Sequence, residues 1–252
     1  MKIQNYVAVD LEMTGLNAKR DSILEIGAVR VKNKQVEAEY QALIHPHLEL
    51  SEEVIALTGI TNEMAAGGRE MDEVFPDIME FFGDSPLLGH NVMFDYGFLK
   101  QAAINRNTPF ERQGIDTLKI ARKVLPPDEK KTLQALCGRF GIVCGHRHRA
   151  LDDALAAMEL YELLEAAHET AQPELFVPFP LVYKTKKQQP ATNRQKNHLK
   201  QLADYHGIVL NVSWETLTKN EASRQIDRLI SQYGRIPKPD GGCPPGCADM
   251  RS

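Results

Sequence analysis

Apolar residues in the first half of the chain fall into short runs bounded by polar or turn-forming residues. The runs Tyr6–Leu11, Ile23–Val31 and Val36–Ile44 have the length and composition typical of strands. Only the turn-forming residues KNKQ separate the second run from the third, so we expect an antiparallel meander. Two shorter runs, Pro86–Gly89 and Ile115–Thr117, are further strand candidates.

Apolar residues at helical spacing follow the meander and alternate with the two shorter strands. This spacing predicts helices over Glu70–Phe82, Asn91–Ile104, Thr132–Phe140 and Leu151–Ala167, with Asn91 able to cap the second of them. Three successive strands followed by alternating helices and strands favour a mixed α/β sheet.

The pattern changes at Pro173, where four prolines and a basic run predict a linker. Beyond it, TNRQ at Thr192 and TKNE at Thr218 match the capping box that begins a helix. Gly207 and Gly234 stand where those two helices would end. We therefore expect a first domain over 1–172, a linker over 173–190, a small helical module over 191–236 and a disordered tail over 237–252.

Composition and charge narrow the class of protein. The chain has no run of about 18 apolar residues and no apolar stretch at its start, which predicts a cytoplasmic protein without a membrane partner. The net charge is −10 over residues 1–183 and +7 over residues 184–238. An acidic body with a basic appendage raises the question of nucleic-acid binding, although basic segments are often only solvated surface.

Four cysteines do not suggest a disulfide scaffold in a chain of 252 residues. Cys243 and Cys247 could bind zinc with Cys137 or Cys144. Their irregular spacing and the Gly/Pro-rich tail favour free thiols instead.

Two acids, Asp10 and Glu12, lie at the end of the first predicted strand. Residues two apart on a strand point to the same side, so their carboxylates would repel one another unless a cation lies between them. A divalent metal is the natural cation for paired oxygen ligands. A single D-x-E pattern is weak evidence, because solvated charges at a strand end explain most instances.

Two later segments add titratable groups at helix starts. Asp95 lies in the first turn of a predicted helix, and His148 precedes a helix whose first turns carry Asp152 and Asp153. Acids at a helix N-terminus are common because they interact favourably with the helix dipole. The spacing alone does not choose between Asp152 and Asp153.

Taken together, VDLEMTGL, HNVMFD and HRALDDA resemble the three motifs of the DEDDh family, the DnaQ-like 3′–5′ exonucleases. The third family motif, H-x-A-x-x-D-A, selects Asp153. The segments ILEIGAVRV, LTGIT and TLQALCGRFGI are also similar to the proofreading exonucleases of bacterial replicative polymerases. The resemblance covers residues 4–168 and keeps the order of the motifs.

This resemblance implies a ribonuclease H-like fold with a mixed five-stranded sheet flanked by helices. It implies that two Mg²⁺ or Mn²⁺ ions are held by four carboxylates and that His148 is the general base, since an imidazole suits proton abstraction near neutral pH. The expected metal ligands are Asp10, Glu12, Asp95 and Asp153.

The implied reaction releases nucleoside 5′-monophosphates from the 3′ end of DNA that is single-stranded, frayed or mispaired. The implied setting is proofreading or DNA repair in the bacterial cytoplasm, with a DNA polymerase or a repair complex as a partner.

Four further residues are candidates for contact with the substrate. The resemblance places Met13 and Thr14 along the terminal nucleotide, and Phe94 beside Asp95 could stack on terminal bases. Asn91 is the fourth candidate. Core packing explains Met13 and Phe94 equally well, and helix capping alone explains Asn91.

Two alternatives and one additional hypothesis follow from the same residues. DLEMTGL is also the first motif of oligoribonucleases, so an RNA-preferring exoribonuclease of the oligoribonuclease or RNase T type is the main alternative. A catalytically silent nucleic-acid-binding module is a remote one. Basic pairs at Lys196/Lys200 and Arg224/Arg228 suggest that the C-terminal module grips a nucleic-acid backbone, although a solubilising or partner-docking role explains them as well.

Overall fold

The computed structural model describes residues 3–143, 149–210 and 212–237. The chain forms two compact units, Met1–Gln188 and Gln189–Ser252. Among the described residues, no helix has the length and apolar character needed to cross a membrane.

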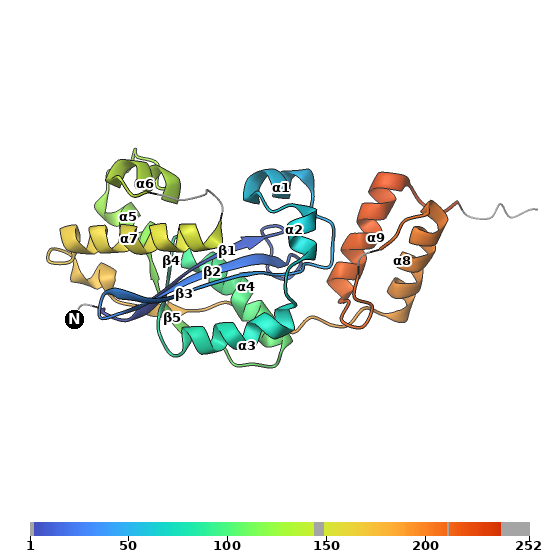
Figure 1. The fold of residues 1–252 in the computed structure, drawn as a ribbon, viewed down its shortest axis with the longest axis horizontal. Helices are drawn as coiled ribbons and strands as arrows, with labels where there is room; N and C mark the ends of the chain where they lie inside the picture. Colours follow the sequence, from blue (N-terminus) through green and yellow to red (C-terminus); the bar gives the residue numbers. More distant parts are fainter. Residues whose placement is uncertain (1–2, 144–148, 211, 238–252) are drawn as a thin grey trace, which may run out of the picture. The chain divides into compact units, whose positions relative to one another are not determined.

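The first unit is built on one mixed sheet of six strands in the order β3-β2-β1-β4-β5-β6 (Figure 1). The expected meander is confirmed, since β2 pairs antiparallel with both β1 and β3. The short strands continue the sheet beyond β1, with β4 parallel to β1 and β5 parallel to β4. The strands are β1 (Tyr6–Met13), β2 (Ile23–Lys32), β3 (Gln35–Leu43), β4 (Leu87–Gly89), β5 (Arg112–Asp116) and β6 (Phe179–Leu181).

The sixth strand corrects two expectations, the five-stranded sheet and the linker over residues 173–190. β6 pairs antiparallel with β5, and a single 3-10 turn, η1 (Pro173–Phe176), precedes it. Phe176 and Leu181 are buried in the first unit. Proline is tolerated on an edge strand because it has only one paired side there, so Pro180 is compatible with β6. The proline-rich composition indicated a linker, but this segment contains the strand that completes the sheet.

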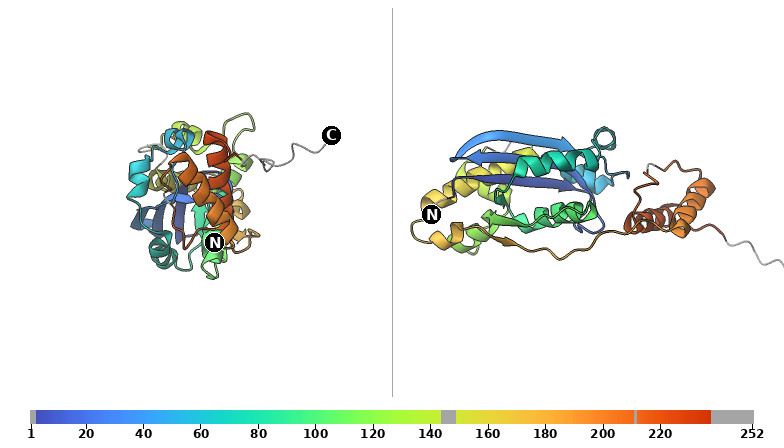
Figure 2. Two further views of the ribbon diagram at one scale, coloured as in Figure 1. Left: turned by 90° about the vertical axis from the view of Figure 1, so that its right-hand side faces the viewer. Right: turned by 90° about the horizontal axis from the view of Figure 1, so that it is seen from below.

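Helices cover both faces of the sheet. One core layer packs residues of α3 and α4 against one face, and a second packs residues of α5, α6 and α7 against the other (Figures 1 and 2). Two short helices, α1 and α2, enclose a smaller apolar cluster. The helices of this unit are α1 (Glu52–Thr58), α2 (Asn62–Ala66), α3 (Met71–Phe82), α4 (Val92–Asn105), α5 (Thr117–Val124), α6 (Leu133–Phe140) and α7 (Ala150–His168).

The second unit contains α8 (Asn193–His206) and α9 (Lys219–Tyr233). Both predicted capping boxes are present, and Gly207 and Gly234 occupy the C-cap positions. A small apolar core joins the two helices and the segment between them, through Leu199, Leu202, Leu217, Ala222 and Leu229. The expected tail lies outside the described residues from 238 onward.

Candidate active site

The period of the central strand decides which way its acids face. Ala8 packs in the core layer beneath α5–α7, whereas Val9 packs in the layer beneath α3 and α4. Side chains two apart on a strand share a face, so Asp10 and Glu12 continue the series of Ala8 toward α7. Glu12 is buried and Asp10 is partly buried.

Helix α7 brings Asp153 to these two acids. Ligand oxygens of Asp10, Glu12 and Asp153 all lie within 4.8 Å of one another. Gly27, which pairs in register with Asp10, explains how the helix approaches so closely. A Cβ atom on Gly27 would lie 2.1 Å from the carbonyl carbon of Ala150 and from the backbone nitrogen of Leu151. Only glycine allows the start of α7 to rest on the strand at this position.

The fourth acid, Asp95, comes from the first turn of α4 and is 4% exposed. The backbone N–H of Leu11 and its own backbone N–H donate to its carboxylate, which lowers its pKa, but burial is the larger effect. Asp95 contributes the largest charge effect of any neighbour on Asp10. Strand β1 and helices α4 and α7 thus bring four carboxyl groups to one place.

Three of these groups, Asp10, Glu12 and Asp95, are costly to ionise where they lie. Burial raises the pKa of Asp10 well above its usual value, and the nearby charges of Asp95, Asp153 and Glu12 raise it further. Burial, followed by Asp153, raises the pKa of Glu12 to about 8, and burial raises that of Asp95 to about 8. Carboxylate oxygens are the ligands that Mg²⁺ and Mn²⁺ prefer, and a divalent cation would favour the ionised forms. The donor set therefore fits such a metal.

The predicted base lies beyond what the structure describes. His148 is outside the described residues, as are Cys144, Cys243 and Cys247. The described chain resumes at Arg149, the N-cap residue of α7. Any role of His148 therefore rests on the family motif.

Glu25 is a site residue that the motifs did not single out. It is fully buried on β2, opposite Glu12 in register. Its carboxylate accepts hydrogen bonds from Nη2 of Arg149 at 2.7 Å and from the backbone N–H of Ala150 at 3.1 Å. The side chain of Arg149, the N-cap residue, does not accept a hydrogen bond from the first turn of α7. The carboxylate of Glu25 accepts one instead, from the backbone N–H of Ala150. The available sequence signal was an acid inside the apolar run ILEIGAV.

Met13 and Phe94 both contact the core, which agrees with the core-packing explanation of these two residues. Each is partly buried and packs against the apolar layer beneath α3 and α4. Met13 follows an irregularity in the pairing of β1 with β2, after Glu12. Phe94 makes an edge contact with Phe98 at 5.6 Å between ring centroids. Neither contact prevents the exposed part of the side chain from touching a substrate.

Thr14 and Asn91 have local structural roles. The Thr14 hydroxyl accepts a hydrogen bond from the backbone N–H of Ser22 at 2.9 Å, which closes the loop after β1. Asn91 occupies the N-cap position of α4, but the expected side-chain cap is absent. Its φ of 74° places it in the left-handed region, which asparagine tolerates better than most residues. Its backbone N–H donates to Asp116 instead.

Comparison with known proteins identifies the family. The RNase_T model, described as an exonuclease, matches residues 7–161. The DNA polymerase III subunit epsilon of Aquifex aeolicus is 35% identical over 157 residues, which span 62% of this chain and 78% of that protein. The chain belongs to this exonuclease family.

Other relatives are much longer proteins. DNA polymerase III PolC-type of Clostridium perfringens is 36% identical over 155 residues, which span 62% of this chain but only 11% of the polymerase. The PolC-type protein of Latilactobacillus sakei is 41% identical over 167 residues, or 12% of its length. The chain thus spans about a tenth of the PolC-type relatives it matches.

Solved structures share the fold. Exonuclease X in complex with 5′ overhanging duplex DNA matches with a TM-score of 0.52 and 25% identity, covering 65% of this chain and 92% of that one. The nuclease domain of 3′hExo, a DEDDh family member bound to rAMP, matches with a TM-score of 0.58 and 18% identity, covering 71% and 98%. E. coli Exonuclease I in complex with a dT13 oligonucleotide matches with a TM-score of 0.59 and 19% identity. The match covers 69% of this chain and 43% of that one.

The contact between Glu25 and α7 predicts a positioning role. In Glu25→Gln the start of α7 loses its charged partner, so Asp153 is held less firmly. We expect kcat to fall by about 10- to 100-fold, as for residues that orient metal ligands, and the Mg²⁺ concentration for half-maximal activity to rise. Steady-state kinetics at several Mg²⁺ concentrations measure both.

Glu37→Gln is the matched control, because Glu37 pairs with Arg30 and Lys32 on the exposed face of β3. It should leave both quantities unchanged. Wild-type kcat and Mg²⁺ dependence in Glu25→Gln would show that Glu25 does not position the site.

Proposed function

We propose that this chain is a two-metal-ion 3′–5′ exonuclease that removes nucleoside 5′-monophosphates from the 3′ end of DNA. The observation that carries the proposal is the meeting of Asp10, Glu12, Asp95 and Asp153, from three elements, at one partly buried place. Family membership supports the nuclease chemistry. The substrate and the number of metal ions are the parts that the proposal adds.

The four acids would hold the ions, and Mg²⁺ or Mn²⁺ matches their oxygen ligands. When bound, the ions supply stabilisation of the charge on the attacked phosphate and a lower pKa for the attacking water. His148 accepts the proton of that water, the role given by the family motif. Glu25 and Gly27 keep the start of α7, and with it Asp153, against β1. Met13 and Phe94 lie close enough in sequence to the acids to contact the terminal base.

Two observations favour DNA over RNA. The relatives at 35–41% identity are named as DNA polymerase III proteins. Exonuclease X, at 25% identity, was solved with duplex DNA. Against this stand the DLEMTGL motif, which oligoribonucleases share, and the 3′hExo structure with rAMP, which shows likeness of fold alone. An RNA-preferring exoribonuclease is therefore the second candidate.

The relatives also suggest a partner. Proofreading requires a polymerase, and the epsilon subunit of Aquifex aeolicus is covered over 78% of its length. We therefore include a DNA polymerase or a repair complex in the proposal as the partner class.

A substrate panel tests the proposed preference. We expect Mg²⁺-dependent digestion of single-stranded DNA and of duplex DNA with a mispaired 3′ end, at higher kcat/KM than for RNA of two to five nucleotides. The products should be 5′-monophosphates, identified by chromatography. Faster loss of short RNA than of either DNA would overturn the choice of DNA.

His148→Ala in the same assay separates the substrate question from the mechanism. It should abolish most of the activity on every substrate while Mg²⁺ binding persists. If activity survived this change, the proposed base would be wrong.

Two basic residues of the C-terminal unit also have contacts within that unit. Nζ of Lys196 donates a hydrogen bond to the backbone carbonyl of Trp214. Nζ of Lys200 lies 4.9 Å from the centroid of the Trp214 ring. We retain the grip on the nucleic-acid backbone as a proposal that involves both basic pairs, Lys196/Lys200 and Arg224/Arg228. Arg224 and Arg228 are partly buried.

A chain ending after Gln188 tests this grip, since that end keeps β6 in the sheet. The proposal predicts weaker binding of single-stranded DNA and a shallower dependence of affinity on salt, by about one unit of slope for each lost phosphate contact. Fluorescence anisotropy at several salt concentrations measures both. Unchanged affinity and slope would exclude the grip and favour a solubilising or docking role.

A further inference from the structure

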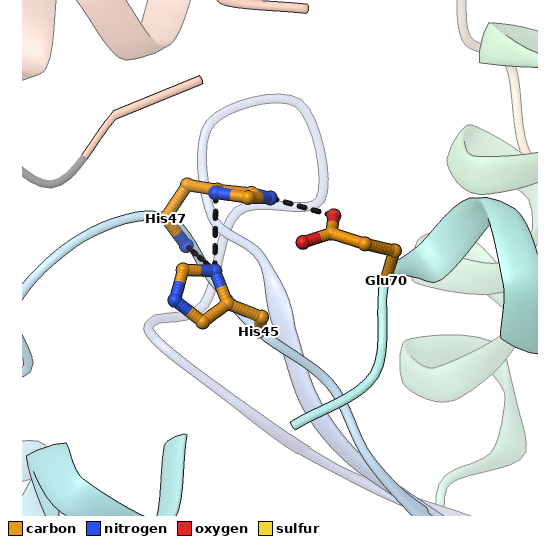
Figure 3. Close-up of side chains that lie close together, drawn as sticks. All are labelled: His45, His47 and Glu70. Carbon is orange, nitrogen blue, oxygen red and sulfur yellow. Dashed lines mark hydrogen bonds and ion pairs between the residues drawn. The ribbon is translucent and has the colours of Figure 1, made fainter. Parts of the chain in front are cut away.

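A second group of metal-type ligands lies apart from the four acids in sequence, where β3 ends and α3 begins. His45 and His47 follow β3, and Glu70 immediately precedes α3 (Figure 3). One ring nitrogen from each histidine and one carboxylate oxygen of Glu70 lie within 4.8 Å of one another. The described residues contain two groups of this kind, and the other is Asp10, Glu12 and Asp153.

The backbone around the three side chains is held in place. The N–H of His45 donates to the carbonyl of Arg69 at 2.9 Å, and the N–H of Arg69 donates to the carbonyl of Leu43 at 2.9 Å. Gly68 permits this approach, because a Cβ atom there would lie 2.7 Å from the nitrogen of His45. The segments that carry His45 and Glu70 are thus fixed against one another before any ligand binds.

A strained turn directs the two imidazoles together. His47 has a φ of 52°, a conformation that costs free energy for a residue with a side chain and often marks a functional site. Its ring meets that of His45 edge to face, with 4.3 Å between centroids and 67° between the ring planes, and the two Nδ1 atoms are 3.0 Å apart (Figure 3).

The hydrogen bonds leave two lone pairs facing each other. Nε2 of His47 lies 2.7 Å from Oε2 of Glu70, so this nitrogen carries the proton of a neutral ring and Nδ1 is unprotonated. Nδ1 of His45 accepts the backbone N–H of His47 at 3.2 Å, so it is unprotonated too. Two such nitrogens 3.0 Å apart require a cation between them. That cation is either a second proton on His47 or a metal ion.

We propose that His45, His47 and Glu70 form a binding site for a divalent transition-metal ion, with Zn²⁺ the best match. Two nitrogen ligands at 2.0–2.1 Å from a tetrahedral zinc ion are about 3.3 Å apart, close to the separation of the two Nδ1 atoms. A metal-binding histidine normally donates its other ring N–H to a carboxylate, as His47 does to Glu70. Water would complete the coordination, since Glu70 is about half exposed.

The two ligand groups would select different ions. Imidazole nitrogen suits zinc and its neighbours, whereas carboxylate oxygen suits Mg²⁺ and Mn²⁺. An ion bound here would tie the end of β3 to the start of α3 and stabilise the folded chain in proportion to its occupancy.

Zinc binding to the full chain tests the proposal without reference to nuclease activity. Isothermal titration with Zn²⁺ in excess Mg²⁺ would compare the wild-type chain, His47→Ala, Glu70→Gln and Asp153→Asn. All four would carry Cys243→Ser and Cys247→Ser, since thiols also bind zinc. We expect His47→Ala to lose one equivalent of bound zinc and Asp153→Asn to keep it. Glu70→Gln should bind that equivalent about 10- to 100-fold more weakly.

Glu73→Gln is the matched control, because Glu73 is an exposed acid in the first turn of α3. It should bind zinc as the wild type does. Equal numbers of bound zinc ions in the wild-type chain and His47→Ala would overturn the proposal. The contact between the two Nδ1 atoms would then be explained by a second proton on His47. If His47→Ala failed to fold, undiminished zinc affinity in Glu70→Gln would overturn it as well.

Discussion

Negative charge confined in a buried place is the constraint on which the rest of this molecule depends. Strand β1 directs Asp10 and Glu12 toward α7, and the helices add Asp95 and Asp153. Burial opposes the ionised form of these acids, and each charge opposes its neighbours. Such a cluster stays ionised near neutral pH at a lower cost in free energy where a bound cation offsets the repulsion. The need for a divalent metal therefore follows from the packing of the sheet and its helices as well as from the family motifs.

The same packing explains why residues remote from the chemistry matter to it. Gly27 lets the first turn of α7 rest on the sheet, and the buried carboxylate of Glu25 holds that turn by its backbone amide and by Arg149. Asp153 follows within one turn of the helix. Its position thus depends on a glycine and an acid of the neighbouring strand, both of which belong to the apolar run ILEIGAV.

Local signals in the sequence predicted the parts of this structure that local physics controls. The meander followed from periodicity, the two C-terminal helices followed from capping boxes at Thr192 and Thr218, and three motifs singled out the acids that the fold brings together. Longer-range features were missed. β6 was hidden by its prolines, and the Glu25–Arg149 pair joins residues 124 apart. Helices α1 and α2 are short and depend on capping by Ser51 and Thr61.

Thermal unfolding as a function of pH, with and without Mg²⁺, tests the central claim most directly. An acid with a raised pKa in the folded state stabilises the fold only while it is protonated. The metal-free chain should therefore lose stability as the pH rises from about 4 toward 8, the interval between the unfolded value and the pKa of about 8 for Glu12 and Asp95. Mg²⁺ should restore that stability, and Asp10→Asn should reduce both the loss and the rescue. A melting temperature that Mg²⁺ does not change near pH 8 would contradict the account.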